Sequence, residues 1–344
     1  QFETVLNDYL PNSEVVKNDM KRMYSNVVEM DNKVGLILKQ LEEDNLLEKT
    51  IIVFFTDHGG PLPREKRLLY DSGIKVPMII RFPNKIRSGE RDNRLISFVD
   101  FTPTLLSISN ISIPDYLQGI AFEGIFKSNE DRKYIHAAAD RFDEHYDMIR
   151  AVRDKRYKYL KNFKPKKPYY LPLEYREKMD TMQELITMSK NNQLDSIQSQ
   201  WFRKEKPAEE LFDIYLDPYE INNIANDPKF NHKLKELRKE CLRWMEEVDD
   251  KGFIPEEKLI ESFWPNKKQP ITSSPTIKIV ENTLVLASDT EGTNIGYKNL
   301  KADLTPWAGW IPYVGPIKIK KGDRIKIKAH RIGYLPSKEL IYEN

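Results

Sequence analysis

The stretch TIIVFFTDHGG, residues 50–60, decides the fold class. It opens with an apolar run at residues 51–55, made of β-branched and aromatic side chains with almost no polar alternation. Such a run predicts a strand buried on both faces, as in a parallel sheet flanked by helices. The polar, glycine-containing end predicts a loop where the strand finishes, and ligands gather at that edge of open α/β sheets.

The segments around this strand continue an α/β pattern. A helical apolar period predicts a long helix over residues 13–43, capped by Asn12 or Ser13. A second buried strand is expected at residues 76–83, and a third at residues 134–139. Between them, Asp100 or Thr102 can cap a helix with Pro103 in its first turn. Strands alternating with helices predict a layered α/β domain.

The pattern of strands alternating with helices ends near residue 148, and the sequence after it is more polar. Residues 149–153 and 157–160 predict a hairpin, residues 171–205 are polar and helix-prone, and residues 229–249 predict an amphipathic helix. A Pro/Ser/Thr-rich segment at residues 265–275 predicts a linker.

The part after the linker alternates with a period of two. Residues 317–320 and 325–329 alternate strictly, with Lys321-Gly322-Asp323 between them, which predicts a hairpin with one solvated face. Short strands separated by turn signals across residues 276–344 predict a small all-β sandwich.

Composition narrows the class of protein. The net charge of +2 over 344 residues argues against a general nucleic-acid binder. No apolar run approaches the ~18 residues of a membrane span. The single cysteine, Cys241, excludes an internal disulfide and is expected to pack in a helix. Because the chain starts at Gln1 without an initiator Met, we expect it to be a cut chain.

Three polar groups follow predicted strands. Asp57 and His58, with two glycines behind them, suit a cation, although a plain turn has the same pattern. A basic cluster shortly downstream suits a tetrahedral anion or is simply a solvated surface. A polar loop after the third strand suits substrate recognition or is an exposed charged loop. The candidate substrate- and anion-binding side chains are Arg64, Lys66, Arg141, Glu144 and His145.

Taken together, these motifs resemble the sulfatase family of the alkaline-phosphatase superfamily, and within it the sulfamidase-like (heparan N-sulfatase-like) branch. Six blocks carry the resemblance in the family's order: residues 30–35, 51–59, 63–77, 99–106 followed by Gly119, 150–159, and the closing block 210–225.

The resemblance implies a fold, a reaction and roles for residues. The fold would be the C-terminal part of an alkaline-phosphatase-like α/β sandwich with a small antiparallel subdomain. The reaction would be formylglycine-dependent hydrolysis of a sulfuric ester or sulfamate on a sulfated carbohydrate, as in glycosaminoglycan degradation. Asp57 and His58 would face a divalent cation, usually Ca²⁺, and Lys66 would contact a sulfate oxygen as a catalytic residue. The family is typically extracytoplasmic.

The sequence departs from the family pattern in two ways. His58 stands where many members have Asn, and because Ca²⁺ prefers oxygen ligands, the identity of the metal is left open. The nucleophile motif, Cys or Ser-x-Pro-Ser-Arg, occurs nowhere in these residues. We therefore expect formylglycine in a missing N-terminal half, and we expect this chain alone to be inactive, with an apolar edge and face uncovered.

The predicted domains are residues 1–264, the C-terminal part of a sulfatase catalytic domain with the antiparallel subdomain at about 148–264, and residues 276–344, the β-sandwich. That sandwich is similar to the one appended to chitobiases and hexosaminidases, where a structural role is commoner than sugar binding. Two other functions stay open: a phosphohydrolase of the same superfamily, and a non-catalytic carbohydrate-binding or scaffold module.

Overall fold

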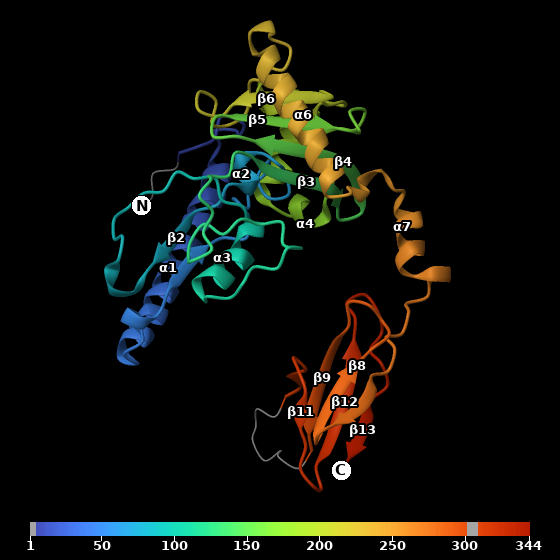
Figure 1. The fold of residues 1–344 in the computed structure, drawn as a ribbon. Coiled ribbons are helices and arrows are strands. Elements are labelled where there is room, and N and C mark those ends of the chain that lie inside the picture. Colours follow the sequence, from blue (N-terminus) through green and yellow to red (C-terminus); the bar gives the residue numbers. More distant parts are fainter. Residues whose placement is uncertain (1–4, 301–308) are drawn as a thin grey trace. The chain divides into compact units, whose positions relative to one another are not determined.

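The computed structural model describes residues 5–300 and 309–344. The chain divides into two compact units, Gln1–Asp250 and Lys251–Asn344, whose elements are labelled in Figure 1. None of the described helices combines the length and apolar character needed to cross a membrane.

The first unit opens with the long helix α1 (Glu14–Glu43). Ser13 caps it by accepting a hydrogen bond from the Val16 backbone N–H at 3.2 Å, as predicted. Only the first turns of α1 are buried, at Val16, Asp19 and Met20. They lie against α5 (Asp180–Lys190), where the Asp19 carboxylate accepts hydrogen bonds from the Thr181 backbone and hydroxyl.

Strand β1 (Ile52–Phe55) pairs antiparallel with β2 (Met78–Arg81) in a two-stranded sheet. The predicted parallel pairing was therefore wrong. The intervening chain forms only one helical turn, α2 (Asp71–Ile74), in place of the crossover helix that parallel pairing needs. The prediction of a strand buried on both faces was also wrong. Val53 and Phe55 are 38% and 42% exposed, and β1 alternates between half-buried and exposed residues.

Helix α3 (Phe101–Ile108) follows the two-stranded sheet. A capping box precedes it. The Asp100 carboxylate accepts a hydrogen bond from the Ser97 backbone N–H, and the Ser97 side chain accepts one from the Asp100 backbone N–H. The predicted helix start is confirmed, with Asp100 at the cap position.

A four-stranded antiparallel sheet forms the centre of the first unit. Its strand order is β3 (Ile135–Phe142), β4 (His145–Arg153), β5 (Tyr157–Asn162) and β6 (Glu209–Asp213). The predicted hairpin at residues 149–160 and the predicted strand at 134–139 are confirmed.

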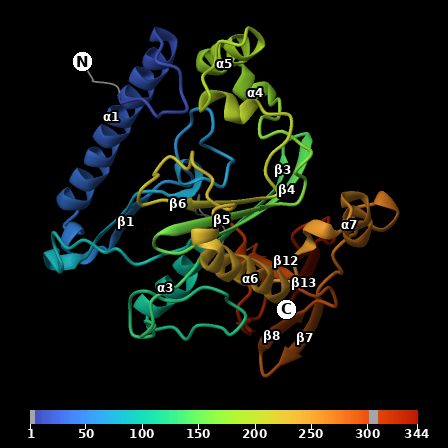
Figure 2. The same cartoon turned by 90° about the horizontal axis from the view of Figure 1, so that it is seen from above.

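Both faces of this sheet are covered. Helix α6 (Asn231–Glu247) lies across one face, as both views show, and buries Leu237 and Cys241 against Val152 and Tyr159 (Figures 1 and 2). The other face packs against the loop before α2, against α5, and against the segment at residues 169–173 that precedes the short helix α4 (Glu174–Glu177). The amphipathic helix and the buried helical cysteine predicted there are confirmed.

The second unit contains α7 (Glu256–Phe263) and two antiparallel sheets around one apolar core. The sheets have the orders β10-β9-β12-β13 and β11-β8-β7. Their strands are β7 (Thr276–Val280), β8 (Thr283–Ala287), β9 (Asn294–Asn299), β10 (Ile311–Pro312), β11 (Ile317–Lys318), β12 (Arg324–His330) and β13 (Leu340–Glu343).

The predicted β-sandwich is confirmed, but the hairpin predicted within it was wrong. Strand β11 pairs with β8, whereas β12 lies between β9 and β13 in the other sheet. The turn at Lys321-Gly322-Asp323 therefore carries the chain from one sheet to the other. Alternation reveals which face of a strand is buried, and it does not reveal the partner strand.

Candidate active site

The loop that follows β1 carries the predicted metal ligands. The Asp57 side chain is 87% exposed, and its carboxylate lies 3.6 Å from His58 Nε2. His58 Nδ1 lies 2.8 Å from the Gly59 carbonyl oxygen. Because a carbonyl can only accept, this contact requires the proton on Nδ1, and Nε2 is the ring nitrogen that faces Asp57.

The two glycines of this loop are needed for close contact with a neighbouring segment. The backbone N–H groups of Gly59 and Gly60 donate to the carbonyls of Gly73 and Ser72, at 2.9 and 3.2 Å. A Cβ on Gly59 would lie 1.9 Å from the Ser72 carbonyl oxygen. The loop is thus fixed by the backbone of residues 72–73, which lie within α2.

Lys66 lies in the same loop region as the metal ligands. Its backbone N–H donates to the Gly60 carbonyl at 3.0 Å, and its side chain is half-buried. The described part of the chain offers its ammonium no carboxylate within ion-pair distance. An unpaired, half-buried cation in the loop that carries two candidate ligands suits an anionic substrate group.

Arg64 has a different environment from the one predicted. Its guanidinium donates at 2.7 Å to the carbonyls of Tyr219 and Glu220 and lies over the rings of Tyr9 and Tyr70. The side chain is buried. The structure therefore assigns Arg64 to packing of the loop at residues 217–222 and gives no support to substrate binding, because its charge is used by backbone carbonyls and aromatic faces.

The turn between β3 and β4 touches this region through Arg67. The Arg67 guanidinium lies 2.9 Å from the Asp143 carboxylate, next to Glu144. The His145 ring lies 3.6 Å from the Glu144 carboxylate, and both side chains are solvent-accessible. Arg141 pairs with Tyr146 across the same turn. The sequence reasoning missed Arg67, which had been treated only as part of a basic cluster.

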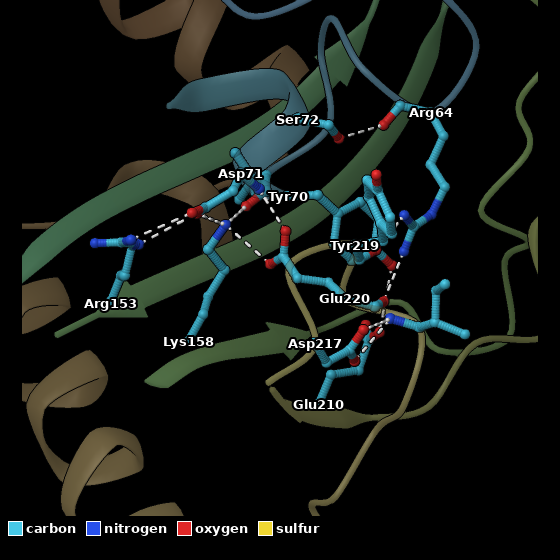
Figure 3. Close-up of polar contacts among 12 residues, drawn as sticks. Arg64, Tyr70, Asp71, Ser72, Arg153, Lys158, Glu210, Asp217, Tyr219 and Glu220 are labelled. Atoms are coloured by element: carbon cyan, nitrogen blue, oxygen red, sulfur yellow. Dashed lines mark hydrogen bonds and ion pairs between the residues drawn. The ribbon is translucent and has the colours of Figure 1, made fainter. Parts of the chain in front are cut away.

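A buried ionic network supports the segment that holds the glycine loop (Figure 3). Lys158, fully buried in β5, places its ammonium 2.6 Å from Asp71 and 2.9 Å from Glu220. It also donates to the Leu69 carbonyl at 3.0 Å. Arg153 in β4 reaches both Asp71 oxygens at 3.2 Å. Two cations thus balance two carboxylates in the interior.

The pKa values of the two carboxylates respond differently to this environment. Burial would raise the pKa of Asp71, but Lys158 and Arg153 outweigh it and hold the pKa below the usual value of 3.8. Burial raises the pKa of Glu220, and its attraction to Lys158 opposes that rise. Arg153 and Lys158 lie in the sequence block at residues 150–159, and Glu220 lies in the block at residues 210–225. The spacing of these blocks along the sequence does not predict that they meet at Asp71.

Asp57 and His58 form only part of the ligand set that a metal ion needs. Within residues 5–300 and 309–344, no group of three or more His, Cys, Asp or Glu side chains is arranged to hold a metal ion. Asp57 and His58 supply one carboxylate and one imidazole, whereas Ca²⁺ takes 6–8 oxygen ligands. The carboxylate fits a hard cation, and further oxygen ligands would have to join it.

Comparisons with known proteins identify the protein family to which these residues are similar. Residues 4–111 match the family model described as Sulfatase. Residues 64–205 match the model described as the C-terminal region of N-sulphoglucosamine sulphohydrolase. Residues 4–205 therefore carry sulfatase-family sequence, as the resemblance predicted.

Two curated relatives show how much of such proteins this chain represents. It is 52% identical over 333 residues to an ulvan-active sulfatase from Formosa agariphila, an alignment that covers 96% of this chain and 56% of that protein. It is 24% identical to human N-sulphoglucosamine sulphohydrolase, over 76% of this chain and 55% of that protein. The chain thus spans a little over half the length of either relative.

A solved structure agrees with the fold. The Bacteroides fragilis protein yidJ, named there as a candidate sulfatase, superposes with a TM-score of 0.51 at 23% identity, covering 71% of this chain and 47% of that one. This likeness concerns the fold alone, and it agrees with the predicted mixed α/β class.

Proposed function

We propose that the protein containing this chain removes sulfate from a sulfated polysaccharide of the ulvan type. The observation that carries this proposal is the 52% identity to an ulvan-active sulfatase, which extends over 96% of the chain and includes the second unit.

The residues of this chain would bind and orient the sulfate group. Asp57, with His58 beside it, would supply part of the ligand set of a divalent cation, which when bound neutralises sulfate oxygens. The unpaired ammonium of Lys66 would contact another sulfate oxygen and stabilise the charge that develops there. The turn carrying Arg141, Glu144 and His145 would contact the sugar, since Arg67 ties that turn to the same loop.

The nucleophile would come from outside these 344 residues, which contain no Cys or Ser-x-Pro-Ser-Arg segment. We propose a formylglycine there, and we propose that the 344-residue chain alone is inactive and that the whole protein is exported. Residues 276–344 would act as a structural appendage.

The test is hydrolysis by the full-length protein, produced together with a formylglycine-generating enzyme. We expect sulfate release from ulvan oligosaccharides and from 4-nitrophenyl sulfate, and much slower release of phosphate from 4-nitrophenyl phosphate. Lys66→Ala should lower kcat by about 10²–10³-fold, the usual loss of one charge-stabilising group. Lys178→Ala, an exposed lysine paired with Glu174 on α4, is the matched control and should leave kcat as it is.

Two outcomes would contradict the proposal. If the modified full-length protein released no sulfate from any of these substrates, the enzyme would not be a sulfatase. If phosphate were released faster than sulfate from the matched esters, the phosphohydrolase alternative would replace it.

A further inference from the structure

A second basic region lies in the first unit, apart from the loop after β1. A surface hollow of about 600 Å³ is formed by residues 87–94, residues 127–131 and the turn between β4 and β5. None of its lining residues belongs to the loop at residues 56–67 or to the turn at residues 141–145. Its size falls within the range of ligand sites, about 300–1,000 Å³. Its cationic side chains are Arg87, Arg91, Arg94, Lys127 and Lys155.

Two of these cations build the wall of the hollow. Glu123 accepts from Arg87 at 2.7 Å and from Arg94 at 3.1 Å, so one half-buried carboxylate holds two guanidinium groups side by side. Glu90 and Asp92 bind the same two arginines from other directions. These pairs neutralise Arg87 and Arg94 and fix the shape of the wall.

The remaining cations are available to a ligand. Arg91 and Lys127 are exposed, and neither has a hydrogen bond or ion pair from its side chain to any residue that the structure describes. Lys155 lies 3.7 Å from Asp131 with both side chains more than half exposed, and such surface pairs contribute little. A wall held by ion pairs, together with the two unneutralised cations Arg91 and Lys127, suits a ligand with several negative charges.

The rest of the lining decides between classes of polyanion. The lining contains no aromatic or aliphatic residue. Its two carboxylates, Asp92 and Asp131, lie against Arg94 and Lys155, and the other polar groups are the Ser128 hydroxyl and the side-chain amides of Asn93 and Asn129. Single-stranded nucleic acids are held largely by bases stacked on aromatic rings, which this hollow lacks. Sulfate groups suit Arg and Lys, while hydroxyl groups suit amides.

We propose that this hollow is an accessory binding site for a sulfated polysaccharide chain, separate from the loop proposed to cleave sulfate. It would hold the polymer through the sulfates of sugar units other than the one being hydrolysed. The identity of the polymer rests on the proposed function, whereas the existence of the site rests on Arg91, Lys127 and the wall behind them.

The test measures binding without hydrolysis. Full-length protein produced without the formylglycine-generating enzyme, and so lacking the nucleophile, is titrated calorimetrically with an ulvan-derived octasaccharide and with the same octasaccharide after chemical desulfation. Arg91→Ala combined with Lys127→Ala should weaken binding of the sulfated probe by about tenfold, because two exposed charge contacts are lost. The desulfated probe should bind much more weakly to every variant.

The control is Lys33→Ala combined with Lys39→Ala. It removes two exposed lysines that pair with Glu29 and Glu43 along α1, so the net charge changes equally, and affinity should remain that of the unaltered protein. The site is refuted if the hollow variant binds the sulfated probe as tightly as the control does. It is also refuted if a duplex DNA of matched charge binds as tightly as the octasaccharide. If the hollow variant loses binding but the full-length protein cleaves no sulfate, only the proposed function fails.

Discussion

The first unit contains two antiparallel sheets that are covered to very different extents. In the four-stranded sheet, neighbouring residues of β4 are buried on opposite faces: Val152 against α6 and Ala151 against the core on the other side. In the two-stranded sheet, Phe55 and Ile79 remain 42% and 64% exposed. The candidate active-site loop starts from the less covered sheet.

The difference shows where the geometry of the site comes from. The loop after β1 donates backbone hydrogen bonds to the carbonyls of residues 72–73, and the preceding residue, Asp71, is held by Arg153 and Lys158 of the four-stranded sheet. The well-packed sheet therefore supports the chemistry carried by the poorly covered one. Four changes test this division, in order of expected effect.

Replacing Lys158 by Met should cause the largest loss of stability. It would leave Asp71 and Glu220 buried without their shared cation, at a cost of about 3–5 kcal/mol in the free energy of unfolding. Chemical denaturation measures this loss. The control, Lys178→Met at an exposed helix pair, should change stability by less than about 0.5 kcal/mol. A loss below about 1 kcal/mol at position 158 would mean that the network does not support the segment around Asp71.

Replacing Gly59 by Ala should cost about 1–3 kcal/mol, because its new Cβ would meet the Ser72 carbonyl oxygen at 1.9 Å and the backbone would have to move. Gly35→Ala is a control that should change the free energy of unfolding in the opposite direction. Gly35 lies within α1 with nothing within 4 Å of the position that an added methyl group would take, so alanine should stabilise by about 0.5–1 kcal/mol. Equal melting temperatures for the two variants would contradict the close packing of the loop.

The pH dependence of stability should show the lowered pKa of Asp71. A carboxylate with a folded pKa below its unfolded value of about 3.8 stabilises the protein above that pH and loses the contribution as the pH falls further. Asp71→Asn should therefore flatten the decline in unfolding free energy below about pH 4. An unaltered acid limb in urea titrations over the range of about pH 2–5 would show that Asp71 is not held by Lys158 and Arg153.

Replacing Ile79 by Lys should have the smallest effect on folding, within about 0.5 kcal/mol, because the side chain is already 64% exposed. Its effect on association should be larger: we expect the 344-residue chain alone to self-associate through this apolar face and the variant to do so less. Light scattering at increasing concentration measures this. A monodisperse parent chain would show that the face is not adhesive.

The sequence predicted those elements whose signals are local. A cap at Ser13 and a helical period defined α1, and turn residues at 154–156 defined the β4–β5 hairpin. Pairing partners were missed, since an apolar run at residues 51–55 and the alternation at 317–329 do not specify direction or neighbour. Those depend on the path of the intervening chain.

In the candidate site, too, the sequence predicted local features and missed contacts between distant segments. Asp57, His58 and Lys66 lie in one loop, so the sequence placed them in the same segment, and the backbone of Lys66 bonds to Gly60 in that loop. Arg64 lies two residues before Lys66 but points into the interior, because the carbonyls that bind it come from residues 219 and 220. The contacts among Asp71, Lys158 and Glu220 join three distant segments and left no local pattern.

The lone thiol in α6 provides a natural reporter of motion. Cys241 is packed against the four-stranded sheet, and burial raises its pKa to about 12. The sulfur therefore stays protonated and unreactive toward alkylating reagents while the helix is seated. Because these 344 residues contain no second cysteine, the rate at which Cys241 is alkylated would report how often α6 separates from the sheet, with no engineered label.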